Sequence, residues 1–150
     1  MKHRILDPDA TRDSGHMRTH ILILETGEEV SATLRGFAEA HHLSSGSFKA
    51  IGALSGAKVG WFNWDTKKYE IAASFEEQVE VLSLIGDIAL GDGKPMVHAH
   101  LIVGRRDGSA HGGHLMEAFV RPTLEVVLTE SPQTLRRKFD PASGLALIQP

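Results

Sequence analysis

The residues best suited to chemistry in this sequence are two histidines separated by one residue, His98 and His100. The segment 96–103 around them has the pattern of a β-strand, in which successive side chains point to opposite faces. The two imidazoles therefore share one face, with their Cα atoms roughly 6.6–6.8 Å apart. The other face is wholly apolar and is expected to face the core: it carries Val97, Ala99, Leu101 and Val103.

A third metal ligand is predicted shortly after this strand, at His114. Gly112 and Gly113 precede it, and we expect them to form a tight turn that brings the ring toward the strand. His111 lies outside this turn and is the weaker candidate. Neutral imidazole binds zinc, copper, iron or nickel, and three histidines plus water form an established zinc site.

From the spacing alone a second interpretation stays open, in which the histidines form a polar sheet face and the glycines only serve a hairpin. The cupin motif does not fit, because it needs a glutamate soon after the second histidine and residues 101–106 contain none. The histidine cluster predicts a site for one divalent ion, zinc before other metals, held by His98, His100 and His114.

Other kinds of site lack their sequence signals. The chain has no cysteine, which excludes a disulfide framework, a thiolate metal site and a cysteine nucleophile. It has no Gly-X-Ser-X-Gly elbow, no phosphate-binding Gly-X4-Gly-Lys motif and no dinucleotide-binding motif. The carboxylates Glu80, Glu117 and Glu125 form no evident pair. We therefore assign no catalytic residue.

Length and charge narrow the class of protein. A chain of 150 residues fits one domain and needs no metal merely to fold. Its net charge is -3, without the basic stripe that is usual in DNA-binding proteins. The short basic groups at 67–68, 105–106 and 136–138 are interpreted as solvated turns. No apolar run reaches the roughly 20 residues of a spanning helix, so we expect a cytoplasmic protein without membrane contact.

The elements that must position the histidines are mostly strands. Residues 1–17 are interpreted as a flexible N-terminal arm, and 18–150 as a single domain. We expect a buried strand at 21–24, then a helix over 31–43 capped by Ser31. Further strands are predicted at 48–54, 58–64, 69–75, 79–88, 96–103, 124–128 and 145–148. The predicted fold class is α+β, an α/β sandwich-like domain with a mostly antiparallel sheet and one or two packed helices.

Several motifs together resemble the plants-and-prokaryotes-conserved (PPC) domain over residues 18–132. They are Gly93-Lys94-Pro95, His98-Ala99-His100, Gly112-Gly113-His114-Leu115, the strand EVLSLIGDI at 80–88, Ile51-Gly52-Ala53-Leu54 and the strand PTLEV at 122–126. The resemblance implies a domain that assembles as a homotrimer. It also matches the three histidines to the family's histidines one by one, which strengthens the prediction of a metal site.

The chain departs from the plant members of that family in two places. The nearest match to an AT-hook is Arg35-Gly36, which lacks the arginine and proline that complete the hook. Gln78-Val79 stands where plant members carry an Arg-Phe pair in a segment tied to partner binding. The resemblance therefore does not imply direct DNA binding through an AT-hook, although protein partners are expected.

Three functions are compatible with these observations. The first, which we prefer, is a stand-alone oligomeric binding module with a three-histidine metal site. The second is a transcription-associated protein that acts through protein contacts or weak DNA binding, which a salt-dependent shift of duplex DNA would support. The third is a metal-dependent enzyme of unknown substrate, which an open coordination position on the metal would favour.

Overall fold

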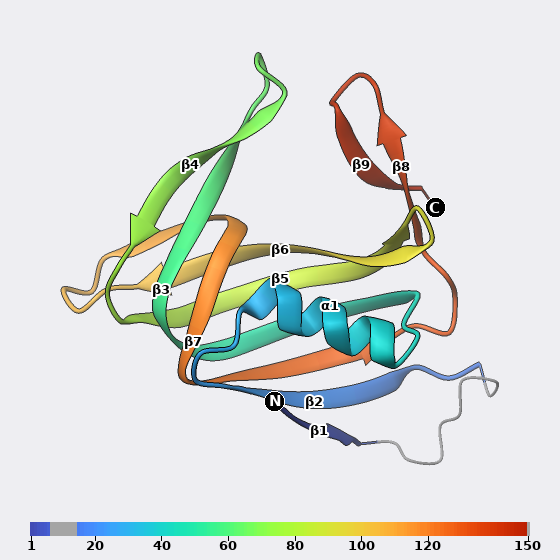
Figure 1. Cartoon of the computed structure of the whole chain (residues 1–150), viewed down its shortest axis with the longest axis horizontal. Helices are drawn as coiled ribbons and strands as arrows, with labels where there is room; N and C mark the ends of the chain where they lie inside the picture. Colours follow the sequence, from blue (N-terminus) through green and yellow to red (C-terminus); the bar gives the residue numbers. More distant parts are fainter. Residues whose placement is uncertain (7–14, 150) are drawn as a thin grey trace.

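The computed structural model describes residues 1–6 and 15–149. Over these residues the protein is mostly β, with 67% strand, 8% helical residues and a single helix. The strands form one mixed sheet of nine strands (Figure 1). The predicted α+β sandwich with packed helices was therefore wrong. The strands are much longer than the sequence pattern indicated, and they leave little chain for helices.

The elements follow one another in this order: β1 (Lys2–Ile5), β2 (Arg18–Glu25), α1 (Val30–Ala40), β3 (Ser45–Asn63), β4 (Lys68–Phe75), β5 (Val79–Gly91), β6 (Lys94–Gly104), β7 (Ala110–Glu130), β8 (Arg136–Asp140) and β9 (Leu145–Gln149).

Strand β3 shows why the pattern misled. We expected two strands, at 48–54 and 58–64, but one strand runs through both, with register shifts around Gly52 and Gly56. Gly52 has φ +151°, and a Cβ there would lie 2.3 Å from the carbonyl oxygen of Thr123. Such irregularities bend a strand and interrupt the alternation of buried and exposed residues without ending the strand. β7 likewise extends far beyond the predicted segment 124–128.

The sheet closes on itself around four of its strands. β7 pairs with β3 and β6, and β5 pairs with the same two strands, so β3, β5, β6 and β7 form a ring. All of these pairings are antiparallel, whereas β8 joins β5 in parallel, which makes the sheet mixed. The hairpins β3–β4 and β8–β9 both project beyond the ring on the same side (Figure 1).

Helix α1 covers one face of the sheet and is close to the predicted helix. Its N-cap is Glu29 rather than Ser31, and the Glu29 carboxylate accepts a hydrogen bond of 2.6 Å from the backbone N–H of Ala32. The helix ends at Ala40 rather than 43, because His42 adopts a left-handed conformation with φ +52°.

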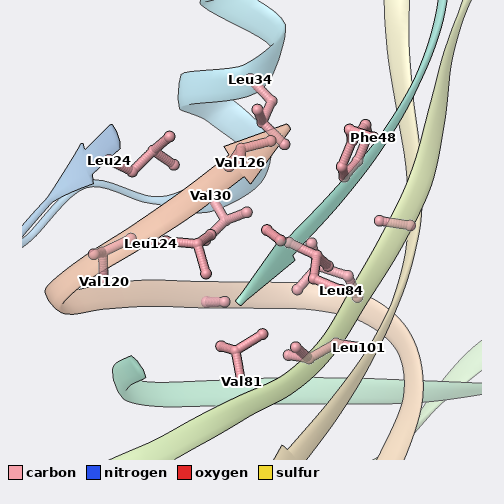
Figure 2. Packing of buried hydrophobic residues seen from close by; sticks show 14 of the residues in the cluster. Leu24, Val30, Leu34, Phe48, Val81, Leu84, Leu101, Val120, Leu124 and Val126 are labelled. Atoms are coloured by element: carbon pink, nitrogen blue, oxygen red, sulfur yellow. The ribbon is translucent and has the colours of Figure 1, made fainter. Parts of the chain in front are cut away.

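The core lies between this helix and the sheet (Figure 2). Leu34 of α1 packs there with Leu124 and Val126 of β7, and Leu84 of β5 and Leu101 of β6 belong to the same buried cluster. Leu124 and Val126 lie two positions apart on β7, as expected for a strand with one buried face. The core therefore holds β6 and β7, the two strands that carry the predicted metal ligands.

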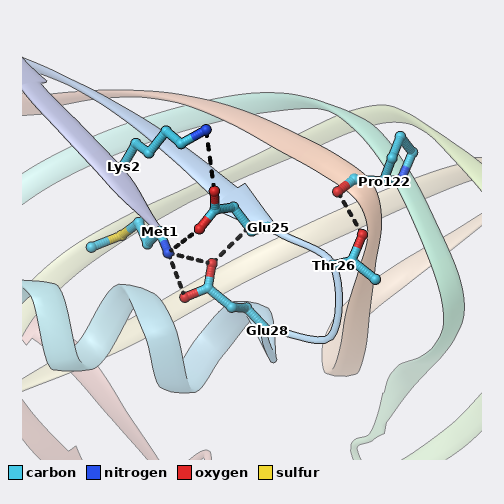
Figure 3. A network of polar contacts seen from close by, with 6 residues as sticks. All are labelled: Met1, Lys2, Glu25, Thr26, Glu28 and Pro122. Atoms are coloured by element: carbon cyan, nitrogen blue, oxygen red, sulfur yellow. Dashed lines mark hydrogen bonds and ion pairs between the residues drawn. The ribbon is translucent and has the colours of Figure 1, made fainter.

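The N-terminal segment is paired in its described part. β1 runs antiparallel to β2, and the amino group of Met1 lies 3.0 Å from a carboxylate oxygen of Glu25 and 3.1 Å from Glu28 (Figure 3). His3 Nε2, on the edge strand β1, lies 3.0 Å from Nδ1 of the buried His20 on β2. Residues 7–14 of the predicted flexible arm lie outside the described residues. In the described part of the chain, no helix is long and apolar enough to cross a membrane.

Candidate metal centre

Strand β6 presents two of the three predicted ligands. Its core-facing side chains Ala99, Leu101 and Val103 are buried, as the alternation predicts. His98 is half-buried and His100 is exposed, and both lie on the opposite face of the strand. The apolar side of β6 is thus anchored in the core and sets the direction of both imidazoles.

The third histidine comes from the neighbouring strand. In the antiparallel pairing of β6 with β7, His100 lies directly opposite His114, so the two side chains share one face. The ring centroids of His114 and His98 are 5.2 Å apart, and those of His114 and His100 are 5.7 Å apart. One nitrogen from each of the three rings lies within 4.8 Å of the other two. The sheet register therefore brings together the three predicted ligands.

The glycines before His114 act differently from the prediction. Gly112 and Gly113 lie inside β7, not in a turn, and the turn falls earlier, at residues 105–109. A Cβ on Gly113 would lie 2.5 Å from the carbonyl oxygen of Gly60, so glycine permits the close approach of β7 to β3. His111 is exposed, packs near Phe75 at a centroid distance of 5.5 Å, and takes no part in the cluster.

His114 is a half-buried imidazole that is neutral at pH 7. It stacks on Tyr69 with 4.1 Å between ring centroids, and its Nδ1 is buried without a hydrogen-bond partner in the described part of the chain. Burial, together with the nearby charges of His98 and His100, lowers the pKa of His114 to about 4. The neutral form, which is the form that binds metals, therefore dominates at neutral pH.

These residues fit a metal ion. Zinc–nitrogen bonds of about 2.0–2.1 Å in a tetrahedron place the ligand nitrogens about 3.4 Å apart. The spread of up to 4.8 Å between the three nitrogens is only slightly wider, so small ring rotations suffice. Three histidines leave the fourth tetrahedral position for a water or another ligand.

Two charged residues beside the histidines were missed by the sequence analysis. Asp87 of β5 pairs with His98 in the sheet register, and its carboxylate lies 3.7 Å from His98 Nδ1. Arg137 of β8 forms an ion pair with the same carboxylate and also donates a hydrogen bond of 3.0 Å to the carbonyl oxygen of Ala146. The interpretation of segment 136–138 as a solvated turn was therefore wrong, because it forms a strand whose Arg137 side chain is buried.

The negative charge of Asp87 is stabilised by its two neighbours, His98 and Arg137. Burial alone would raise the pKa of its carboxyl group, but His98 and Arg137 outweigh burial and hold the pKa below its usual value. Carboxylates in this position commonly orient a metal-binding histidine and fix which ring nitrogen is protonated. Because Asp87 faces His98 Nδ1, His98 Nε2 is the ring nitrogen that would be left to bind a metal.

Comparison with known proteins places this arrangement in context. Residues 11–132 match the family model of the Plants and Prokaryotes Conserved (PCC) domain. A plant- and prokaryote-conserved protein of Pyrococcus horikoshii has a similar structure, with a TM-score of 0.83 and 33% identity over 89% of this chain and 92% of that one. A metal-containing protein of Archaeoglobus fulgidus gives a TM-score of 0.81 and 32% identity over 88% of this chain and 93% of that one.

Two further relatives are a solved structure with a different description and a much longer curated protein. A protein of Bacteroides thetaiotaomicron, named provisionally as DNA-binding, gives a TM-score of 0.83 and 30% identity over 87% of this chain and 91% of that one. The Bifunctional protein GlmU of Synechococcus sp. (strain JA-3-3Ab) is 33% identical over 134 residues. That match covers 87% of this chain and 20% of the other, so the chain spans about one fifth of the length of this curated relative.

Proposed function

Because the chain belongs to the Plants and Prokaryotes Conserved (PCC, also written PPC) domain family, we propose that it is an oligomeric binding module that holds one divalent metal ion, zinc, at His98, His100 and His114. One observation carries the proposal: a nitrogen of each ring lies within 4.8 Å of the other two. The name of the metal-containing relative from Archaeoglobus fulgidus supports it.

Each residue of the site has a separate part in binding. His98 and His100 supply two nitrogens from one rigid strand, and His114 supplies the third from the strand beside it. Asp87 orients His98, and Arg137 holds Asp87 in place. A divalent ion bound there would supply a Lewis-acidic position at which water or an anion can bind.

Elemental analysis of untagged protein tests the proposal. We expect about one zinc ion per chain in the wild type and a stoichiometric loss in the double variant His98→Ala/His100→Ala. The matched control is His111→Ala, which removes an exposed histidine from the same region without touching the cluster. Circular dichroism should show that all three proteins are folded, since the core side of β6 is unchanged. Equal zinc content in the wild type and the double variant would contradict the site.

For the oligomer, we propose a homotrimer that assembles through an apolar surface beside the metal site. This surface, the apolar patch, consists of Ile51, Leu82 and Ile85, whose exposed fractions are 61%, 54% and 57%. Ile85 lies directly opposite His100 in the sheet, so the patch and the histidines share a face. Exposed apolar patches mark interaction surfaces in soluble proteins. The three-fold symmetry follows from the family resemblance.

Light scattering after size exclusion tests the assembly. The expected mass is three times 16.3 kDa for the wild type. Replacing Leu82 with glutamate should shift the protein toward monomer, because a charge would be buried in the interface. Ile71→Glu is the matched control, since Ile71 is 62% exposed but lies on β4, away from the patch. A wild-type monomer at micromolar concentration would contradict the proposal.

DNA binding is the second candidate function, and the name of the relative from Bacteroides thetaiotaomicron favours it. Several basic side chains of the described residues are engaged in ion pairs, among them Lys58 with Glu117 and Arg105 with Glu77. Such pairing weakens attraction to phosphates. A duplex mobility shift that weakens with rising salt would support DNA binding over the metal module.

A further inference from the structure

A small cavity adjoins the histidine cluster, and the proposed function does not yet assign it a ligand. Its volume is about 220 Å³, and His98 and His114 form part of its wall. The β8–β9 hairpin contributes Arg137 and residues 145–147, and Tyr69 lines it from β4. The cavity is therefore bounded by the candidate metal ligands on one side and by the C-terminal hairpin on another.

The charges around this cavity favour an anion. Three neutral imidazoles would leave the two positive charges of a bound divalent ion uncompensated. The cavity wall also contains Arg137, whose ion-pair partner Asp87 is not one of the lining residues. Among the described residues that line the cavity there is no carboxylate. An anionic group beside His98 and His114 would therefore be stabilised.

Arg137 also has an unused hydrogen-bond donor. One of its terminal nitrogens contacts Asp87, and the other donates to the carbonyl oxygen of Ala146. Within the described residues, its Nε has no hydrogen-bond partner, although the atom is buried. Buried donors without partners are rare and costly. An oxygen atom of a bound ligand, reached by a small movement of the hairpin, would satisfy it.

The remaining residues of the cavity wall are apolar and would contact the hydrocarbon part of a ligand. Met96 and Val97 of β6 and Leu145 and Leu147 of β9 supply apolar surface. The volume equals roughly seven water molecules at about 30 Å³ each, which suits a ligand with a short carbon chain. A phosphate group would need several donors, whereas Asp87 and Ala146 already occupy the terminal nitrogens of Arg137.

We propose that this cavity binds a small monocarboxylate, with its carboxylate toward His98, His114 and Arg137 and its short hydrocarbon chain against β9. The inference rests on the metal site proposed above. The match to the family model ends at residue 132, before β8 begins at Arg136. The hairpin that would select the ligand thus lies outside the segment that defines the family.

Visible spectroscopy of untagged protein loaded with Co²⁺ tests the inference without any assay of activity. Isovalerate is the probe, acetate is the control for the hydrocarbon chain, and 3-methyl-1-butanol is the neutral control for the charge. We expect isovalerate to change the cobalt absorption bands and to bind at least tenfold more tightly than acetate. The alcohol should leave the bands unchanged.

A pair of matched variants, one that fills the cavity and one that does not, tests where the ligand binds. Ala146→Leu should weaken isovalerate binding at least tenfold. In the absence of isovalerate, the cobalt spectrum of this variant should match that of the wild type. Ala142→Leu, at an exposed position of the same hairpin, should bind isovalerate like the wild type. The ligand inference alone would be overturned if isovalerate left the cobalt absorption bands unchanged, or if the alcohol changed them as much as isovalerate does. It would also be overturned if isovalerate bound Ala146→Leu as tightly as it binds the wild type. Absence of cobalt binding would overturn the metal site and this inference with it.

Discussion

Replacing Asp87 with asparagine tests the role proposed for this carboxylate at the candidate metal site. The Arg137 side chain is 7% exposed and forms an ion pair with Asp87, which is 29% exposed. Removing one partner of a fully buried pair costs about 3–5 kcal/mol, because a buried charge is left uncompensated. Because water reaches Asp87 in part, we expect the free energy of unfolding to fall by about 2 kcal/mol.

The same substitution should also weaken metal binding. Asparagine removes the negative charge that faces His98 and leaves the Arg137 guanidinium uncompensated beside a divalent ion. Loss of such a supporting carboxylate typically lowers metal affinity 10- to 100-fold. Urea unfolding of protein kept metal-free with a chelator gives the stability. Competition against a chromophoric zinc chelator gives the affinity.

Controls separate this effect from a general loss of charge. Glu117→Gln breaks the exposed ion pair with Lys58 and should leave both the free energy of unfolding and the zinc affinity nearly unchanged. Asp87 has a lowered pKa, so its contribution is complete above its usual value of 3.8 and is lost as the pH falls further. The difference between wild type and Asp87→Asn should therefore shrink below that pH. Unchanged stability and zinc affinity in Asp87→Asn would refute the role assigned to this carboxylate.

Three further predictions concern the scaffold. Leu101→Ala, at a position 1% exposed, should lower the free energy of unfolding by about 3 kcal/mol in urea denaturation, whereas Ile102→Ala, at 45% exposed, should cost under about 1 kcal/mol. Gly113→Ala places a Cβ 2.5 Å from the carbonyl oxygen of Gly60 and should abolish zinc binding in elemental analysis. Its control is Gly36→Ala, at a helix position where a Cβ meets no other atom, which should stabilise the protein by up to about 1 kcal/mol. Burial lowers the pKa of His20 despite the opposing effect of Glu130, so the unfolded chain binds more protons below about pH 6.5. Stability should therefore fall as the pH drops below that value, and His20→Gln should flatten this slope in unfolding curves at pH 5 and 7.

The sequence predicted that His98 and His100 share one face of a strand because that part of the arrangement is local, and the structure adds His114 from the neighbouring strand. The alternation around His98 and His100 identifies both faces of one strand, and this follows from the two-residue period of any strand. Asp87 could have been found in the same way. The turn at Asp92 and Gly93 sets a hairpin register in which Asp87 faces His98.

Other features depend on contacts that no local pattern reveals. Arg137 reaches the site through the parallel pairing of β8 with β5, from a segment whose basic residues are typical of an exposed turn. The fold class was wrong because β3 and β7 each join segments separated by irregularities such as the one at Gly52. Their pairing, and with it the closure of the sheet, is set by packing between distant parts of the chain.

The most direct measurement of the central claim is X-ray absorption at the zinc edge, on untagged protein loaded with one equivalent of zinc. If His98, His100 and His114 hold the ion, the spectrum should show three imidazole nitrogens at about 2.0–2.1 Å, together with one oxygen ligand at a similar distance. The double variant His98→Ala/His100→Ala should lose the imidazole signal. A zinc shell of oxygen atoms alone in the wild type, or an unchanged imidazole signal in the double variant, would contradict the site.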